Sequence, residues 1–224
     1  MVRRGGIMRK TFDEKLENLS QHLIEMGTLI ERAINFTKDA FVMQDAAIAD
    51  EAIKCEQEID YLEKEIERMC LDILLLHQPV ARDLRIVSSA LKMITDMERI
   101  GDQCSDISEI TKLLVGETYI HTLEHIPKMA DATSKMVTDA VDAYVKKDVK
   151  LARKVMKFDD EVDRLFLATK KDLIDTIQDD PDTISQALDL MMVAKYYERI
   201  GDHAENIAEW VVFSLKGNSA KSSR

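Results

Sequence analysis

The sequence predicts an all-α protein made of two tandem three-helix bundles. Its 224 residues include only 7 glycines and 3 prolines, so few residues interrupt helices. Alanine, leucine, methionine, glutamate and lysine fill the long segments between the interruptions, and all of them favour helices. The two halves of the chain also repeat one pattern, which indicates a duplicated unit.

The interruptions place the elements in order along the chain. They are Gln78-Pro79, the stretch from Gly116 to Pro127, and Asp180-Pro181. Three helices are expected before Gly116 and three after it, each antiparallel to its neighbour because the connections are short. The expected ranges are 11–42, 46–76, 81–115, 126–146, 149–177 and 182–215.

The halves align with a nearly constant offset. Asp45 corresponds to Asp148, 103 residues later, and the pentapeptide ERIGD recurs after 100 residues. We therefore expect one three-helix repeat over residues 11–116 and a second over residues 117–217. Residues 1–10 are expected to form a disordered N-terminal arm, and residues 218–224 a frayed C-terminal tail.

Acidic residues form rows beside the apolar faces of the two ERIGD helices. Glu98, Asp102 and Asp106 are spaced i, i+4 and i+8, which places them on one side of a helix. Helices with such rows are destabilised by repulsion between like charges, and the glycine inside each ERIGD adds about 1 kcal/mol. A multivalent cation would turn this repulsion into binding energy.

The same arrangement occurs in the preceding helix of each half and again in the second ERIGD helix. If neighbouring helices pack by their apolar stripes, the acid rows of each half can converge at the shared edge. The alternative is a solvated helix edge whose acids pair with lysine or arginine. The candidate metal ligands are Glu56, Asp60, Glu98, Asp102, Asp106, Asp159, Asp163, Glu198 and Asp202.

The ligand type narrows the choice of metal. Sites made only of carboxylate oxygens suit hard ions such as Fe(III), Mn, Mg or Ca. Zinc is less natural without histidine or cysteine ligands, but it stays open. The first half is richer in candidate ligands, since Asn206 stands where the first half has Asp106.

Composition and motifs exclude several function classes. The net charge of −11 repels nucleic acid and anionic lipid, so no nucleic-acid partner is expected and membrane contact is expected only through other proteins. With neither a signal peptide nor an apolar run long enough to span a membrane, a cytoplasmic protein is expected. We see no arrangement of a nucleophile with a base, and His203 is expected to face solvent or a partner.

The stretches QPVARDLRIVSSALKMITDMERIGD and ALDLMMVAKYYERIGDHAENIAEWVVF resemble the PhoU family, the accessory and regulatory proteins of bacterial phosphate-specific transport. The resemblance runs from about Thr11 to Gly217. It implies two similar three-helix bundles with metal ions on the E/D-x-x-x-D motifs, at the positions given above. It also implies a non-enzymatic adaptor that links the phosphate ABC transporter and its ATPase to a sensor histidine kinase, and that represses the phosphate-starvation response.

Two other readings stay open. A carboxylate-bridged metalloenzyme, such as an oxidase or hydrolase, would need an open coordination position and a substrate pocket. The absence of a Glu-x-x-His signature argues against it. A metal-free helical scaffold would be unaffected by chelators. A homodimer is expected, while the metal's identity and its number per repeat are left open.

Overall fold

The computed structural model describes residues 2–120 and 124–217, with side chains from Lys10 onward. These residues form six long α-helices and contain no strand, so the predicted all-α class is confirmed. The elements are α1 (Val2–Met43), α2 (Ala46–His77), α3 (Arg82–Leu114), α4 (His125–Lys146), α5 (Val149–Asp179), the short 3₁₀ helix η1 (Pro181–Thr183) and α6 (Ile184–Lys216).

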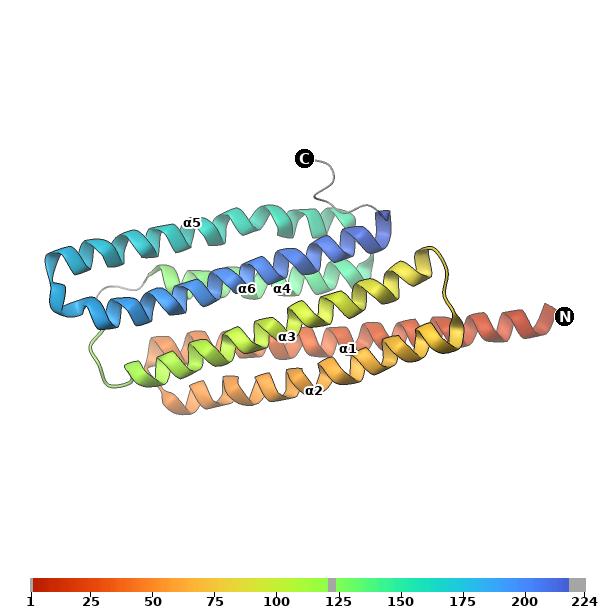
Figure 1. The fold of residues 1–224 in the computed structure, drawn as a ribbon, viewed down its shortest axis with the longest axis horizontal. Helices are drawn as coiled ribbons and strands as arrows, with labels where there is room; N and C mark the ends of the chain where they lie inside the picture. The colour runs from red at the N-terminus through yellow and green to blue at the C-terminus, as the bar shows by residue number, and fades with distance from the viewer. Residues whose placement is uncertain (1, 121–123, 218–224) are drawn as a thin grey trace.

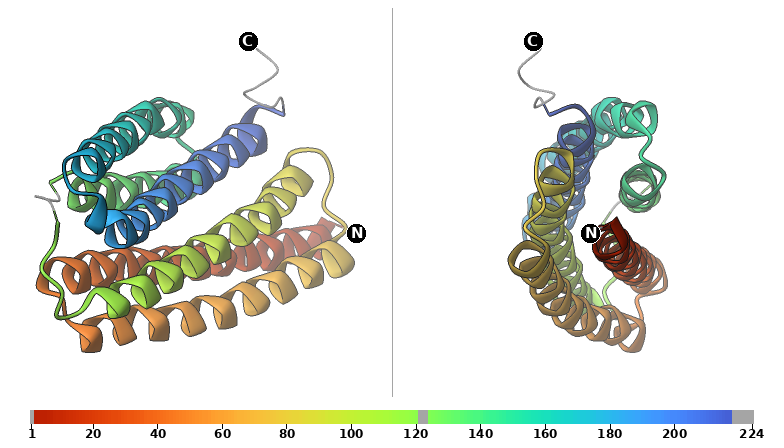
Figure 2. Two further views of the ribbon diagram at one scale, coloured as in Figure 1. Left: turned by 60° about the vertical axis from the view of Figure 1, so that its left-hand side comes forward. Right: turned by 90° about the vertical axis from the view of Figure 1, so that its right-hand side faces the viewer.

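The helices form two layers. In Figure 1, α2, α3, α6 and α5 lie side by side in the front layer, and consecutive helices run in opposite directions. The end-on view in Figure 2 shows that α1 and α4 cover the inner side of this curved layer. Each half is a three-helix bundle, and the two bundles meet where α3 packs on α6 and α1 packs on α4.

Equivalent caps begin the second helix of each half. The Asp45 side chain accepts a hydrogen bond from the Ala47 backbone N–H at 2.8 Å, and Asp148 accepts one from the Lys150 N–H at 2.8 Å. Each cap satisfies a backbone donor that would otherwise lack a partner at the helix start. The alignment of Asp45 with Asp148 therefore marks a repeated structural device.

The first helix differs from its predicted range. It begins at Val2 and not at Thr11, so α1 includes residues 2–10, which were expected to belong to an N-terminal arm. Gly5 and Gly6 lower helix propensity, but the segment contains no proline, so the backbone hydrogen bonding of α1 can continue through it. The predicted tail at residues 218–224 lies outside the described residues.

One continuous hydrophobic core joins the two halves. It includes residues from all six α-helices, among them the fully buried Tyr197 of α6. The Tyr197 hydroxyl lies 2.8 Å from Thr37 Oγ1 of α1, which gives this buried polar group a partner in the other half. None of the helices, over the part of the chain described, has the length and apolarity needed to cross a membrane.

Candidate metal centre

Two buried glycines let helices of each half approach closely. A methyl group on Gly101 of α3 would lie 3.3 Å from Ile59 Cγ2 of α2. A methyl group on Gly201 of α6 would lie 3.0 Å from Asp159 Oδ1 and 3.2 Å from Val162 Cγ1 of α5. The glycine in each ERIGD thus offsets its low helix propensity by bringing the acid-bearing faces of two helices together.

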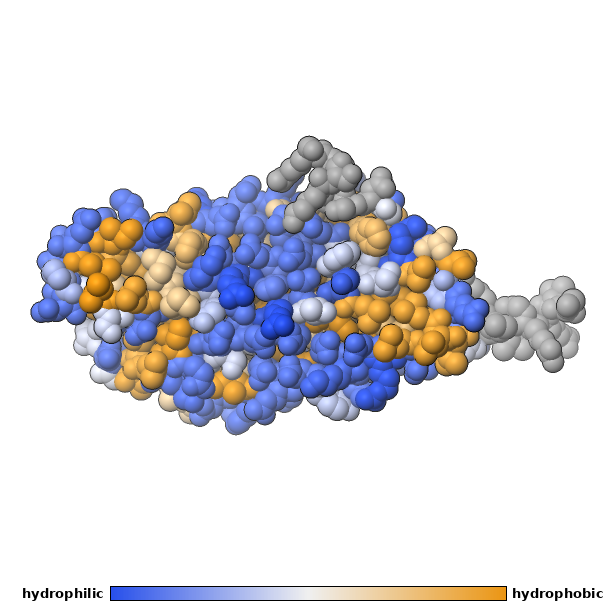
Figure 3. All heavy atoms as spheres, viewed as in Figure 1, coloured by the Kyte–Doolittle hydropathy of each residue, from blue (hydrophilic) through white to orange (hydrophobic). Residues whose placement is uncertain are grey.

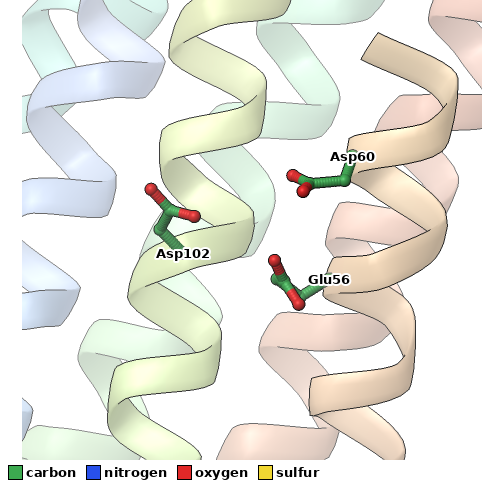
Figure 4. Close-up of side chains that lie close together, drawn as sticks. All are labelled: Glu56, Asp60 and Asp102. Carbon is green, nitrogen blue, oxygen red and sulfur yellow. The ribbon is translucent and has the colours of Figure 1, made fainter. Parts of the chain in front are cut away.

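In the first half, three carboxylates meet across the α2–α3 contact. Glu56, Asp60 and Asp102 can each place one oxygen within 4.8 Å of the others, and all three are partly buried. Figure 4 shows the two α2 side chains pointing toward Asp102 on α3. Among the described residues, this is the one group of three or more histidine, cysteine, aspartate or glutamate side chains whose candidate ligand atoms lie within 4.8 Å of one another.

The electrostatics of this cluster reflect its crowding. Partial burial, followed by repulsion from Asp60 and Asp102, raises the pKa of Glu56. Burial and the neighbouring Asp102 likewise raise the pKa of Glu98, against the opposing effect of Arg99. Both carboxyl groups therefore hold protons more tightly than in water, because burial disfavours their charged forms and the neighbouring carboxylates add repulsion.

Arg99 supplies part of that balance. Its Nη1 lies 2.9 Å from Asp102 Oδ2, and its Nε lies 3.5 Å from Glu98 Oε2. The expected pairing of acids with basic side chains thus occurs, but at the outer edge of the cluster, where Arg99 is exposed. Glu56 and Asp60 have no ion-pair partner among the described residues.

The second half gathers its acids around Asp159. Burial, followed by repulsion from Glu205, Asp163, Asp202 and Glu198, raises the pKa of Asp159 to about 7. Burial and then Glu198 also raise the pKa of Asp202. Glu198 forms an ion pair with Lys195. The four predicted acids of this half therefore share one region, although they form a looser group than the first three.

The sequence reading missed Glu205. It acts on Asp159 more strongly than any predicted ligand of that half, and it lies one helical turn after Gly201. The equivalent residue of the first half is Ser105, so comparison of the repeats alone passes over this position. Its seven-residue spacing from Glu198 puts both on one side of α6, and that spacing is the signal that could have revealed it.

Asp106 lies one helical turn after Asp102 but is not part of the compact group of three carboxylates. Burial and then repulsion from Asp102 raise the pKa of Asp106, against the smaller lowering effect of the hydrogen bond that it accepts from the Tyr196 hydroxyl of α6. At the equivalent position, Asn206 donates from Nδ2 to Asp96 Oδ1 of α3 at 3.3 Å. Asp106 and Asn206 therefore serve the contact between the two halves.

His203 joins the same contact. Its Nδ1 lies 2.9 Å from Asp96 Oδ1, and its side chain is 19% exposed. The expectation that His203 faces solvent or a partner is therefore wrong, because α3 covers that side of α6. Asp96 needs donors here, and His203 and Asn206 provide them.

The first cluster fits a hard cation. Three oxygen donors from two helices converge, and their repulsion gives the site a net affinity for positive charge. Its donor set contains neither histidine nor cysteine, which disfavours a soft metal.

Comparison with known proteins identifies the family. The PhoU domain family model matches residues 23–111 and 126–211. A protein of Clostridium acetobutylicum named phosphate-specific transport system accessory protein PhoU homolog is 35% identical over 93% of this chain and 96% of its own length. A Pseudomonas aeruginosa protein of the same name is 34% identical over 94% of this chain and 87% of its own length.

Two solved structures share the fold. The crystal structure of PhoU from Pseudomonas aeruginosa superposes with a TM-score of 0.88 at 33% identity, covering 92% of this chain and all of that one. The phosphate transport system regulatory protein PhoU from Streptococcus pneumoniae gives a TM-score of 0.87 at 25% identity, with 93% and 99% covered. Two matched repeats, near-complete coverage and a shared fold agree, and the chain belongs to the PhoU family.

Proposed function

We propose that this protein is a metal-binding adaptor of the phosphate-specific transport system that negatively regulates phosphate uptake and the phosphate-starvation response. The observation that carries the proposal is the match, over nearly the whole chain, to relatives named as accessory proteins of that system. Names such as accessory and regulatory protein fit a role without catalysis. The adaptor acts by binding other proteins, and no turnover is required of it.

Its partners in this proposal are the ATPase of the phosphate ABC transporter and a sensor histidine kinase. Both work on the cytoplasmic side of the membrane, so the adaptor is placed there and reaches the membrane only through them. Phosphate is sensed by the partners, because an acidic protein with a net charge of −11 is a poor receptor for an anion. We also propose a homodimer, which light scattering of the purified protein tests directly.

The carboxylate cluster supports the metal-binding part of the proposal. Glu56, Asp60 and Asp102 would hold an ion in the first half, with Glu98 beside them. Asp159, Asp163, Glu198 and Asp202 would hold one in the second half. A bound hard cation supplies positive charge that neutralises the repelling carboxylates. The ligands come from two helices in each half, so their role is to fix α2 against α3 and α5 against α6.

Elemental analysis of untagged protein tests the metal. We expect bound metal in the wild type and a loss of most of it in the double variant Asp102→Asn plus Asp202→Asn. Glu58→Gln is the matched control, because Glu58 is an exposed acid of α2 outside the cluster. Equal metal content in all three proteins would reject the assigned ligands and favour the metal-free scaffold.

Deletion of the gene tests the regulatory role. In a strain without this protein, we expect phosphate-starvation genes to stay active at high phosphate, and a plasmid copy to restore repression. Purified protein should bind the transporter ATPase and the kinase's cytoplasmic part in calorimetry. Normal repression in the deletion strain would reject the regulatory role, while strong binding of inorganic phosphate to the adaptor itself would reject sensing by partners.

A further inference from the structure

The front face of the molecule ends in two apolar tips related by the internal repeat. The first tip patch consists of Leu71, Leu75, Val80 and Leu84, at the α2–α3 connection, and all four are exposed. The second tip patch consists of Ile174, Ile184, Leu188 and Met192, at the α5–α6 connection, and these are exposed as well. Figure 3 shows hydrophobic surface at both ends of this face and hydrophilic surface between them.

Each patch is continuous across its helix hairpin. Antiparallel pairing about the α5–α6 connection puts Ile174 of α5 level with Leu188 of α6. Partly buried Phe166, Ile177 and Met191 pack against the core on the same sides of these helices. Leu188 is 58% exposed and Ile184 is 52% exposed, so a partner could cover much apolar surface here.

The two tips differ in charge. Residues 69–91, which include the first tip patch, contain two acidic and two basic residues. The equivalent residues 172–191 contain six aspartates and neither lysine nor arginine. Around the second tip patch, Asp179, Asp182 and Asp189 pair with none of the basic side chains that the structure describes. Asp172 and Asp175 of the same stretch lie near His125 and Lys171, respectively. The second tip patch is therefore an apolar surface beside three aspartates whose charge is not paired.

We propose that the second tip patch is a docking site for a basic amphipathic helix of a partner protein. Apolar side chains of that helix would cover Ile184 and Leu188, and its lysines or arginines would face the three aspartates. The inference rests on the proposed adaptor function and adds to it the surface used and the chemistry of the bound segment. An anionic lipid surface does not fit, because the aspartates would repel it.

Labelled synthetic peptides test the site on the full-length protein. The probe is a leucine–lysine peptide of about five helical turns with one apolar face. Its controls are a leucine–glutamate peptide of the same pattern and a leucine–lysine peptide of scrambled order. We expect one probe bound per chain, affinity at least about tenfold weaker for both control peptides, and weaker binding as salt increases.

Paired variants locate the binding. Ile184→Ser plus Leu188→Ser should weaken probe binding about tenfold or more, because it removes the apolar contact. Leu75→Ser plus Leu84→Ser makes the same change at the first tip patch and should leave binding within about twofold of the wild type. Replacing Asp179, Asp182 and Asp189 by asparagine should weaken binding and flatten its salt dependence. Circular dichroism checks that each variant keeps its helices.

Four results would overturn the proposal. They are equal losses in the two tip variants, equal binding of the scrambled peptide, binding to phosphatidylglycerol vesicles that depends on Ile184 and Leu188, and self-association through the same two residues. Binding of the transporter ATPase and the kinase distinguishes a failure of the docking site from a failure of the proposed function. If they bind the Ile184→Ser plus Leu188→Ser variant as well as the wild type, the docking site is wrong and the adaptor stands. If they do not bind the wild type, the adaptor function itself fails.

Discussion

At the scale of single residues, Asp159 is the carboxyl group whose surroundings raise its pKa most clearly. Its pKa rises from 3.8 to about 7, first because it is partly buried and then because four other acids surround it. The folded chain therefore holds this proton more tightly than the unfolded chain does between these two pH values. Folding stability from this group is present at the acid end of that window and is lost as the pH rises through about 7.

We therefore expect metal-free protein, kept in chelator, to lose stability between about pH 5 and pH 7.5. Asp159→Asn should flatten this loss and be the more stable protein at pH 8, by about 1–2 kcal/mol once screening at a half-exposed group is allowed for. Thermal melting across this pH range measures it. Asp160→Asn, at the exposed neighbouring position, should behave as the wild type, and an unchanged slope in Asp159→Asn would contradict the assignment.

Asn206 shows that a departure between the repeats can have more than one physical cause. From the sequence, asparagine in place of an acid indicates a weaker metal site, since only the ligand type can be compared. The structure gives a different reason, because the residue faces Asp96 of the other half. An acid at this position would meet another acid, whereas Asp106 meets the hydroxyl of Tyr196. The choice of side chain depends on a contact between halves that sequence spacing does not reveal.

Asn206→Asp should therefore destabilise the protein, by about 1–2 kcal/mol, because it replaces a donor to Asp96 with a second carboxylate. Urea denaturation at neutral pH measures the change. Asp106→Asn is the matched control, and it should cost about 0.5 kcal/mol or less because its amide oxygen can still accept from Tyr196. Equal stability of the two variants would show that the contact of Asn206 with Asp96 does not require an asparagine donor.

At the scale of elements, breakers and caps made the helices predictable. Pro79 and Pro181 mark the hairpin connections, and the Asp45 and Asp148 caps start α2 and α5 where expected. The first-half cluster was also foreseeable, because helical spacing alone puts Glu56 and Asp60 on one edge. The start of α1 at Val2 could not be predicted, because a segment of weak helix propensity can still be helical where it continues an existing helix.

Gly201→Ala probes the approach of α5 to α6. The added methyl would lie 3.0 Å from Asp159 Oδ1, so the carboxylate must move. We expect metal affinity in the second half to fall about tenfold, by analogy with other changes that misplace a ligand. Stability should change by less than about 1 kcal/mol, because the gain in helix propensity offsets crowding of Val162.

Metal titration by calorimetry and thermal melting separate the two effects. Gly101→Ala is the matched control at the equivalent place, where the three atoms nearest to the methyl all belong to Ile59. It should keep the metal affinity of the first half. If Gly201→Ala binds metal like the wild type, then Asp159 is not positioned by this helix contact.

At the scale of the whole molecule, the repeat predicts two bundles but not how they are joined. Periodicity alone cannot predict which helix packs on a given apolar face, so the apolar faces of α3 and α6 could equally have been buried within their own halves. In the structure, α3 packs on α6 and α1 on α4, and one core runs through both halves. Tyr197 is fully buried and finds its polar partner, Thr37, across this contact. The two repeats are therefore structural halves of one folding unit.

It follows that neither half should fold alone. Residues 1–116 without the second half would expose the sides of α1 and α3 that now face α4 and α6, a surface too apolar to be left in water. We expect this fragment to aggregate or to lack a cooperative thermal transition, whereas the full chain should unfold in one transition. Calorimetry of both proteins measures this. The matched control is a full-length chain with a protease site inserted between Gly116 and Glu124. After cleavage, its two halves should stay associated and melt together. If the isolated half is stable and unfolds cooperatively, each repeat is instead an independent domain.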